Sequence, residues 1–205
     1  MIRWKTLVVC AMFAFSLPTE SRGALLIIDH SGATPELLGA TGVNVGGTLY
    51  DVEFVDGTCI LLFDGCDNLA DFDFITQPTA ETAAQALLDQ VFIDLAAPDL
   101  FDTEPEFTFG CSSFLRCDVW IPFGPGDPVE FATAINGDIE ASDLVGSFFI
   151  NPATDTTPIE DVAWARFTPA QVPEPATLLL LGAGLMGAAL RRRSGTSRDG
   201  HPTSE

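Results

Sequence analysis

The stretch TLYDVEFVDGTCILLFDG, residues 48–65, carries the clearest signal for the fold. Between Tyr50 and Phe54, apolar residues alternate with acidic ones, as in a strand with one buried face and one solvated face. Asp56-Gly57 fits a two-residue hairpin turn, and the apolar residues 58–63 are expected to return as a second strand. The stretch therefore predicts an antiparallel hairpin.

Further strands are expected after this hairpin. The segment DFDF, Asp71 to Phe74, alternates in the same way, and VEFATAINGDIE, residues 129–140, carries Asn136-Gly137 as a second hairpin signal. The segments LVGSFFI, residues 144–150, and VAWARF, residues 162–167, are typical of later strands. No repeat is visible, which argues against a solenoid or propeller.

One segment has the period of a helix. Its apolar positions follow i, i+3, i+4, i+7, i+8 and i+11, with Thr79 placed as N-cap: Ala80, Ala83, Ala84, Leu87, Leu88 and Val91. A single amphipathic helix among many strands favours a β-rich α+β fold. We expect an antiparallel β-sandwich with one packed helix.

The region between the two chain ends is strongly acidic. The chain has 29 Asp and Glu residues, and only four of them lie outside residues 24–170. Two of the nine basic residues, Arg116 and Arg166, lie inside, so the formal charge there is 2 − 25 = −23. Such a surface repels nucleic acid and anionic lipid, and it favours solubility and divalent cations.

The acidic region holds an even number of cysteines: Cys59, Cys66, Cys111 and Cys117. In an exported domain this predicts two disulfides, for which three connectivities are possible. The short separations favour Cys59–Cys66 and Cys111–Cys117. A four-thiolate zinc site is the alternative, but its usual C-x₂₋₄-C spacing is absent. We expect no cofactor other than possible Ca²⁺.

Calcium is considered because carboxylates gather in DGCDNLADFD, residues 64–73. Hard oxygen ligands at short spacing suit Ca²⁺, and the candidates are Asp64, Asp67, Asp71 and Asp73. The EF-hand pattern is missing, and a solvated acidic loop explains the same residues.

Sequence motifs for catalysis are absent. No G-x-S-x-G, HExxH or P-loop occurs, and residues 24–170 contain no lysine. Asp29-His30-Ser31 cannot form a catalytic triad, because adjacent residues of an extended chain point to opposite faces. Paired carboxylates could act as in glycosidases, but 25 acidic residues guarantee some close pairs. We expect a protein that is not an enzyme, with a secreted carboxylate-dependent hydrolase as an alternative.

The N-terminus has the pattern of a secretory signal peptide. Arg3 and Lys5 precede an apolar run from Leu7 to Leu17, and Ser21 and Gly23 are small residues suited to a cleavage site. We therefore expect residues 1–23 to be a signal peptide. The exported acidic domain would then span residues 24–170, and Cys10 would leave with the signal peptide.

The C-terminal stretch VPEPATLLLLGAGLMGAALRRR, residues 172–193, has two interpretations. Gly182-x-Gly184-x-x-Gly187 resembles a dinucleotide-binding turn, but only 18 residues follow Gly187, too few for the rest of the unit. The other interpretation is a single membrane helix, residues 176–190, followed by the basic stop Arg191, Arg192 and Arg193. Its 15 residues would span about 22 Å, so flanking arginines and local thinning must cover part of a core of about 30 Å.

The order of these parts resembles the PEP-CTERM sorting signal, also labelled the ice-binding protein C-terminal domain. The resemblance covers residues 171–193, with the motif Val172, Pro173, Glu174 and Pro175. The two prolines hold the motif extended, as a protease substrate requires. The segments GATGVNVGGTLYDVEFVDGTC, residues 39–59, and LFDGCD, residues 62–67, are also similar to other exported PEP-CTERM proteins that are uncharacterised.

The resemblance implies sorting by exosortase, a membrane protease-transpeptidase of Gram-negative bacteria that make exopolysaccharide. The expected partners are this enzyme, the Sec translocon, signal peptidase and extracellular polysaccharide. By the positive-inside rule, residues 194–205 form a polar cytoplasmic tail of a transient single-pass precursor. The mature protein is expected at the cell surface or outside the cell, with a non-catalytic binding or structural role. A calcium-dependent adhesin is the other alternative.

Overall fold

The computed structural model describes residues 23–139 and 143–170 of this chain. The elements in chain order are β1 (Leu25–Asp29), β2 (Glu36–Val45), β3 (Thr48–Val55), α1 (Cys59–Leu62), η1 (Leu69–Asp71), α2 (Gln77–Gln90), η2 (Pro105–Phe107), β4 (Arg116–Gly124), β5 (Val129–Gly137), β6 (Leu144–Ile150) and β7 (Val162–Pro169). The expected signal peptide (apart from Gly23), sorting motif, membrane helix, basic stop and tail lie outside the described residues.

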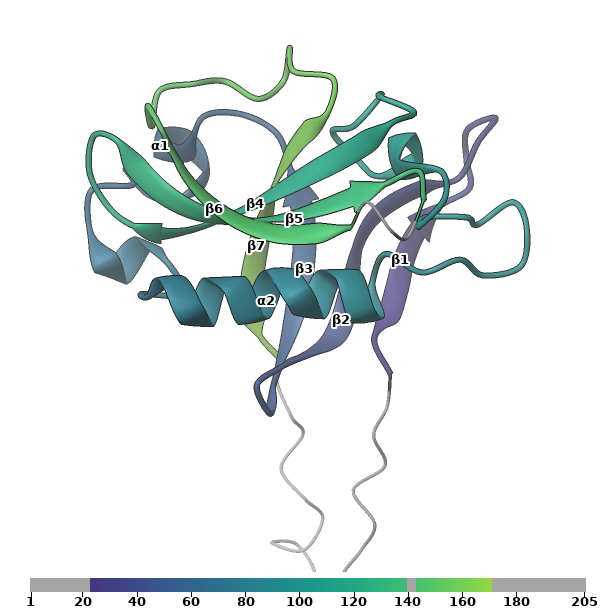
Figure 1. Ribbon diagram of the computed structural model, residues 1–205, viewed down its shortest axis with the longest axis horizontal. Helices are drawn as coiled ribbons and strands as arrows, with labels where there is room; N and C mark the ends of the chain where they lie inside the picture. The colour runs from purple at the N-terminus through teal and green to yellow at the C-terminus, as the bar shows by residue number, and fades with distance from the viewer. Residues whose placement is uncertain (1–22, 140–142, 171–205) are drawn as a thin grey trace, which may run out of the picture. The chain divides into compact units, whose positions relative to one another are not determined.

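The seven strands form one sheet in the order β1-β2-β3-β7-β4-β5-β6. Every neighbouring pair is antiparallel except β4 and β7, which are parallel. The β-rich class and the single large helix are as predicted, whereas the expected sandwich of two sheets is replaced by one mixed sheet. Figure 1 shows the strands curving above and behind α2.

The sheet buries apolar side chains on both faces because its central strands alternate between two clusters. In β7, Ala165 and Phe167 join the cluster that packs against α2, whereas Val162 and Trp164 point to the opposite cluster. The opposite cluster is covered by the segment that follows β3, which contributes Cys59, Phe63, Cys66 and Phe72. A short disulfide-closed segment therefore takes the place of the second sheet.

The prediction of a returning strand at residues 58–63 is wrong. Thr58 is instead the N-cap of α1, and its side-chain oxygen accepts a hydrogen bond from the backbone N–H of Leu61. The prediction of a strand at Asp71–Phe74 is also wrong, since η1 ends at Asp71 and an irregular segment follows. Phe72 packs in one cluster and Phe74 in the other, so this segment links the two clusters.

The hairpin signal at Asn136-Gly137 correctly predicts that the strands around it pair, but Asn136 and Gly137 are not the turn. Strands β5 and β6 are an antiparallel pair, yet both residues belong to β5. Asn136 is fully buried, and its side-chain Nδ2 donates to the carbonyl oxygen of Phe101 at 2.8 Å. The helix prediction holds for α2, which begins a little earlier than expected, with Thr76 and not Thr79 as N-cap.

The four cysteines form the two bridges that the short separations favoured. Cys59 is bonded to Cys66 with a Cα–Cα distance of 5.9 Å, and Cys111 is bonded to Cys117 with a Cα–Cα distance of 5.7 Å. Cys59, Cys66 and Cys117 are 1% exposed or less, and Cys111 is 8% exposed. Both bridges are therefore part of the hydrophobic core.

Replacement of Cys59 and Cys66 together by alanine is expected to lower the free energy of unfolding by about 2.5 kcal/mol. This value is the loop-closure entropy of a bridge that spans so few residues, and lost sulfur packing adds to it. Urea unfolding of the mature protein measures the change. The double substitution Cys111→Ala and Cys117→Ala removes the other bridge, which closes a loop of similar length, and serves as the comparison. Labelling of four free thiols in native protein would contradict the prediction.

Candidate functional site

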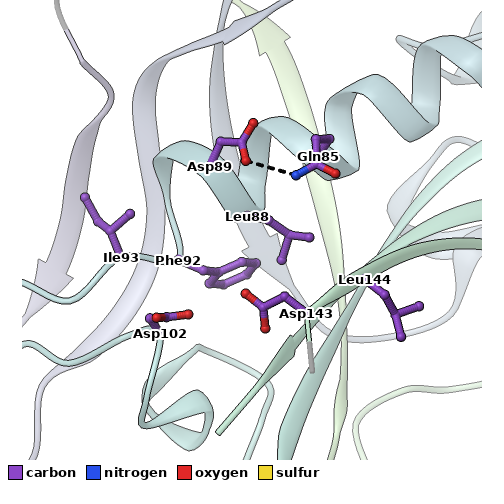
Figure 2. A pocket seen from close by; sticks show the side chains of 8 residues that line it. All are labelled: Gln85, Leu88, Asp89, Phe92, Ile93, Asp102, Asp143 and Leu144. Atoms are coloured by element: carbon purple, nitrogen blue, oxygen red, sulfur yellow. Dashed lines mark hydrogen bonds between the residues drawn. The ribbon is translucent and has the colours of Figure 1, made fainter. Parts of the chain in front are cut away.

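A hollow of about 480 Å³ lies beside the C-terminal half of α2. Helix residues Gln85, Leu88 and Asp89 form one wall, and residues after the helix and at the start of β6 form the rest: Phe92, Ile93, Asp102, Asp143 and Leu144. Figure 2 shows the ring of Phe92 near Leu88, with the carboxylates of Asp102 and Asp143 on either side of it. The hollow thus combines apolar side chains with carboxylates.

Each acidic residue of this hollow makes a hydrogen bond, Asp89 and Asp143 through the carboxylate and Asp102 through its backbone N–H. Asp89 accepts a hydrogen bond from Gln85 Nε2 at 2.9 Å, and Asp143 accepts one from the backbone N–H of Gly137 at 2.9 Å. The backbone N–H of Asp102 donates to Asp94 Oδ1 at 3.0 Å. The lining includes no histidine, serine, cysteine or lysine, so the three carboxylates are the ionisable groups that it offers.

Three of the four calcium candidates line another hollow, of about 280 Å³: Asp64, Asp71 and Asp73. Arg166 lines it as well, and its guanidinium is a fixed positive charge that opposes a bound cation. The Asp71 carboxylate already has a structural role, because its Oδ2 accepts hydrogen bonds from the backbone N–H groups of Asp67 and Asn68. Among the residues that the structure describes, no group of three or more His, Cys, Asp or Glu side chains is arranged to hold a metal ion.

The histidine of the domain lies apart from both hollows. His30 Nε2 is 2.8 Å from Asp99 Oδ1, and the His30 side chain is 55% exposed. Asp29 and Ser31 instead bond to each other, through the backbone N–H and the hydroxyl of Ser31. These hydrogen bonds lower the pKa of Asp29. Asp29-His30-Ser31 is therefore a local turn without the geometry of a catalytic triad.

The most strongly perturbed carboxyl group is that of Asp118 in β4, which the sequence did not single out. Its side chain is 14% exposed, and burial raises its pKa to about 6, although Arg116 opposes the shift and Asp161 adds to it. Arg116 Nε lies 3.4 Å from Asp118 Oδ1, and Arg116 Nη2 lies 3.1 Å from Asp161 Oδ2. Asp118 lines none of the hollows described here, so its perturbation is a property of the sheet.

No helix in residues 23–139 and 143–170 is long and apolar enough to cross a membrane. The expected span, residues 176–190, lies beyond these ranges.

Comparison with protein families finds a PEP-CTERM protein-sorting motif at residues 171–193. No curated protein and no solved structure matches the chain. The match has the limits that the sequence predicted, and it begins two residues after β7 ends at Pro169. A motif of this kind implies export, a precursor anchored through its C-terminal segment, and processing by exosortase. The chain therefore carries a PEP-CTERM sorting motif directly after its acidic, disulfide-bonded domain.

Proposed function

We propose that exosortase releases this protein to the cell surface or extracellular polysaccharide matrix, where the acidic domain has a non-catalytic binding or structural role. The observation that carries the proposal is the sorting motif at residues 171–193. Two disulfides and a lysine-free acidic surface suit an oxidising space outside the cytoplasm.

The hollows of the described domain support a role without catalysis. The larger one presents carboxylates and apolar carbon without a histidine, serine or cysteine, and His30 is bound to Asp99 on the surface. Burial raises the pKa of the Asp118 carboxyl, as in many general acids. This group lies in the sheet beside Arg116, however, and lines none of the hollows described above. A binding or structural function needs none of these groups to react.

Sorting is tested by replacing Pro173, Glu174 and Pro175 with alanine in the full chain. We expect the variant to accumulate as an unprocessed membrane precursor, because the extended motif that the protease reads is lost. Cell fractionation and immunoblotting of the native host measure the mature fraction. Pro158→Ala with Glu160→Ala changes the same residue types in an exposed loop and should mature normally. Normal maturation of the motif variant, or of the wild type in a strain without exosortase, would refute sorting.

The role of the domain is tested with the purified mature protein and the exopolysaccharide of the host. We expect cosedimentation without release of reducing ends. Release of reducing ends that is lost on substitution of an acidic residue would establish the hydrolase alternative instead.

A further inference from the structure

Both ends of the described domain lie at the same end of the sheet. Leu25, the first residue of β1, pairs with Thr41, and Pro169, the last residue of β7, pairs with Tyr50. The β2–β3 hairpin, which turns at Gly46-Gly47, lies at this end too. Figure 1 shows the hairpin tip, the start of β1 and the end of β7 together at the lower end of the domain.

This end of the domain is poor in charged residues, although the carboxylates of Asp51, Asp73 and Glu81 lie at its border. We call it the uncharged end and define it as residues 23–26, 41–50, 74–80 and 167–170, none of which is Asp, Glu, Lys, Arg or His. Its segments are in contact, since the ring of Phe74 lies 5.3 Å from that of Tyr50 and 5.0 Å from that of Phe167. In a domain of formal charge −23, four adjoining segments without charge form a distinct surface.

The uncharged end also exposes apolar side chains. Leu25 is 71% exposed, Ile75 is 56% exposed and Leu49 is 36% exposed. A hollow of about 340 Å³ separates the hairpin from the start of α2, with Thr48, Ile75, Thr79 and the exposed Asp73 in its lining. A partner that covers this surface would remove water from apolar and neutral polar groups, and from a carboxyl group only at Asp73 on the edge of the hollow.

The sorting motif places its protease next to this surface. Val172 is three residues beyond Pro169, so it lies within about 11 Å of the end of β7 whatever path the chain takes. The β2–β3 hairpin continues past the pair Tyr50–Pro169 to Thr48 and the turn, so its tip lies about 7 Å or more beyond the level of Pro169 along the sheet. An enzyme that grips the motif of the folded precursor therefore meets the hairpin tip.

We propose that the uncharged end is the docking surface for the membrane-embedded sorting protease. This inference rests on the proposed sorting function. It adds the surface through which the folded domain would contact the sorting protease. The acidic remainder of the domain then points away from the bilayer, whose anionic headgroups would repel it.

The test follows processing of the full-length precursor by pulse-chase in the native host. Thr48→Glu with Leu49→Glu places two charges on the hairpin and should slow conversion to the mature form by about fivefold or more, since charges at an interface rim act on association. Thr157→Glu with Leu61→Glu makes the same changes beyond the opposite end of β3 and should process at the wild-type rate. Gly46 and Gly47 are left unchanged because their φ angles of 59° and 97° favour glycine.

A spacer separates docking from a folding defect. Insertion of Gly-Ser-Gly-Ser between Ala170 and Gln171 moves the motif away from the domain, so it should slow the wild type to about the rate of the hairpin variant and should add little to the defect of that variant. Wild-type processing of the hairpin variant, equal slowing of both glutamate pairs, or unchanged processing of the wild type with the spacer would overturn the proposal. So would binding of the mature protein to anionic vesicles, or a dimer lost in the hairpin variant, since either gives this surface another occupant. Exosortase-independent maturation of the wild type would instead refute sorting itself.

Discussion

Replacement of Trp164 by alanine is expected to lower the free energy of unfolding by about 4 kcal/mol, as for other buried tryptophans. Trp164 is fully buried in β7, between β3 and β4. Its ring lies 5.2 Å from Trp120, 5.7 Å from Phe63 and 6.0 Å from Phe131. Truncation would leave a cavity where the sheet meets the disulfide-closed segment.

The hydrogen bond of Trp164 contributes less than its packing. Its Nε1 donates to the carbonyl oxygen of Gly57 at 3.2 Å, but the same oxygen also accepts from the backbone N–H and the hydroxyl of Thr156. Trp164→Phe keeps much of the ring and should cost about 1–2 kcal/mol. Urea unfolding measures both variants, with Phe148→Ala, at an aromatic residue 56% exposed, as the control. A loss below about 1.5 kcal/mol for Trp164→Ala would mean that this cluster adds little stability.

The sequence predicted the strands and the helix wherever periodicity was sustained. β3, β6, β7 and α2 are near their expected places: β3 and α2 each have one apolar stripe, β7 buries side chains on both faces, and β6 is an apolar run that remains half exposed. The apolar run at 58–63 is too short for its period to separate helix from strand. The favoured Cys59–Cys66 pairing could have decided between helix and strand for this run. Seven extended residues would span about 23 Å, whereas the bridge requires Cα atoms about 6 Å apart, so this run could not remain a strand.

Two other features depended on contacts that sequence cannot show. Asn136 resembles a turn residue, but in the fold it satisfies the carbonyl oxygen of Phe101, 35 residues away. Asp118 is one of 25 acidic residues, and although it follows Arg116 by two positions, the sequence does not show that its carboxyl group is buried. Its burial and its approach to Asp161 arise from the parallel pairing of β4 and β7, which places residue 118 opposite residue 162. Long-range pairing therefore creates the strongest electrostatic perturbation of the domain.

Like Asp118, several other acidic groups have a pKa that is raised in the folded domain. Burial is the largest cause of the raised pKa values of Asp56, Asp73 and Asp118. The pKa values of Asp29 and Glu81 are instead lowered by hydrogen bonds, but both groups are exposed and their effect on stability is small. A carboxyl group whose pKa is raised on folding binds its proton more tightly in the folded state, so stability falls as pH rises. Self-repulsion of a domain with formal charge −23 acts in the same direction.

Asp118→Asn is expected to remove the largest single part of this pH dependence. The pKa rises from 3.8 to about 6 on folding, so the stabilisation is fully present below pH 3.8 and is lost as pH rises through 6. The shift corresponds to about 3 kcal/mol, most of it between pH 4 and pH 7. The asparagine variant carries no titrating group at this position, and Arg116 keeps Asp161 as its partner. Its stability should therefore approach that of the wild type in acid and exceed it by up to about 3 kcal/mol at pH 7.5.

Urea unfolding across this pH range measures the difference in the free energy of unfolding. The exposed Asp64→Asn serves as a control that should leave the dependence of stability on pH unchanged. Parallel curves for the wild type and Asp118→Asn would show that Asp118 is ionised at little cost within the folded sheet.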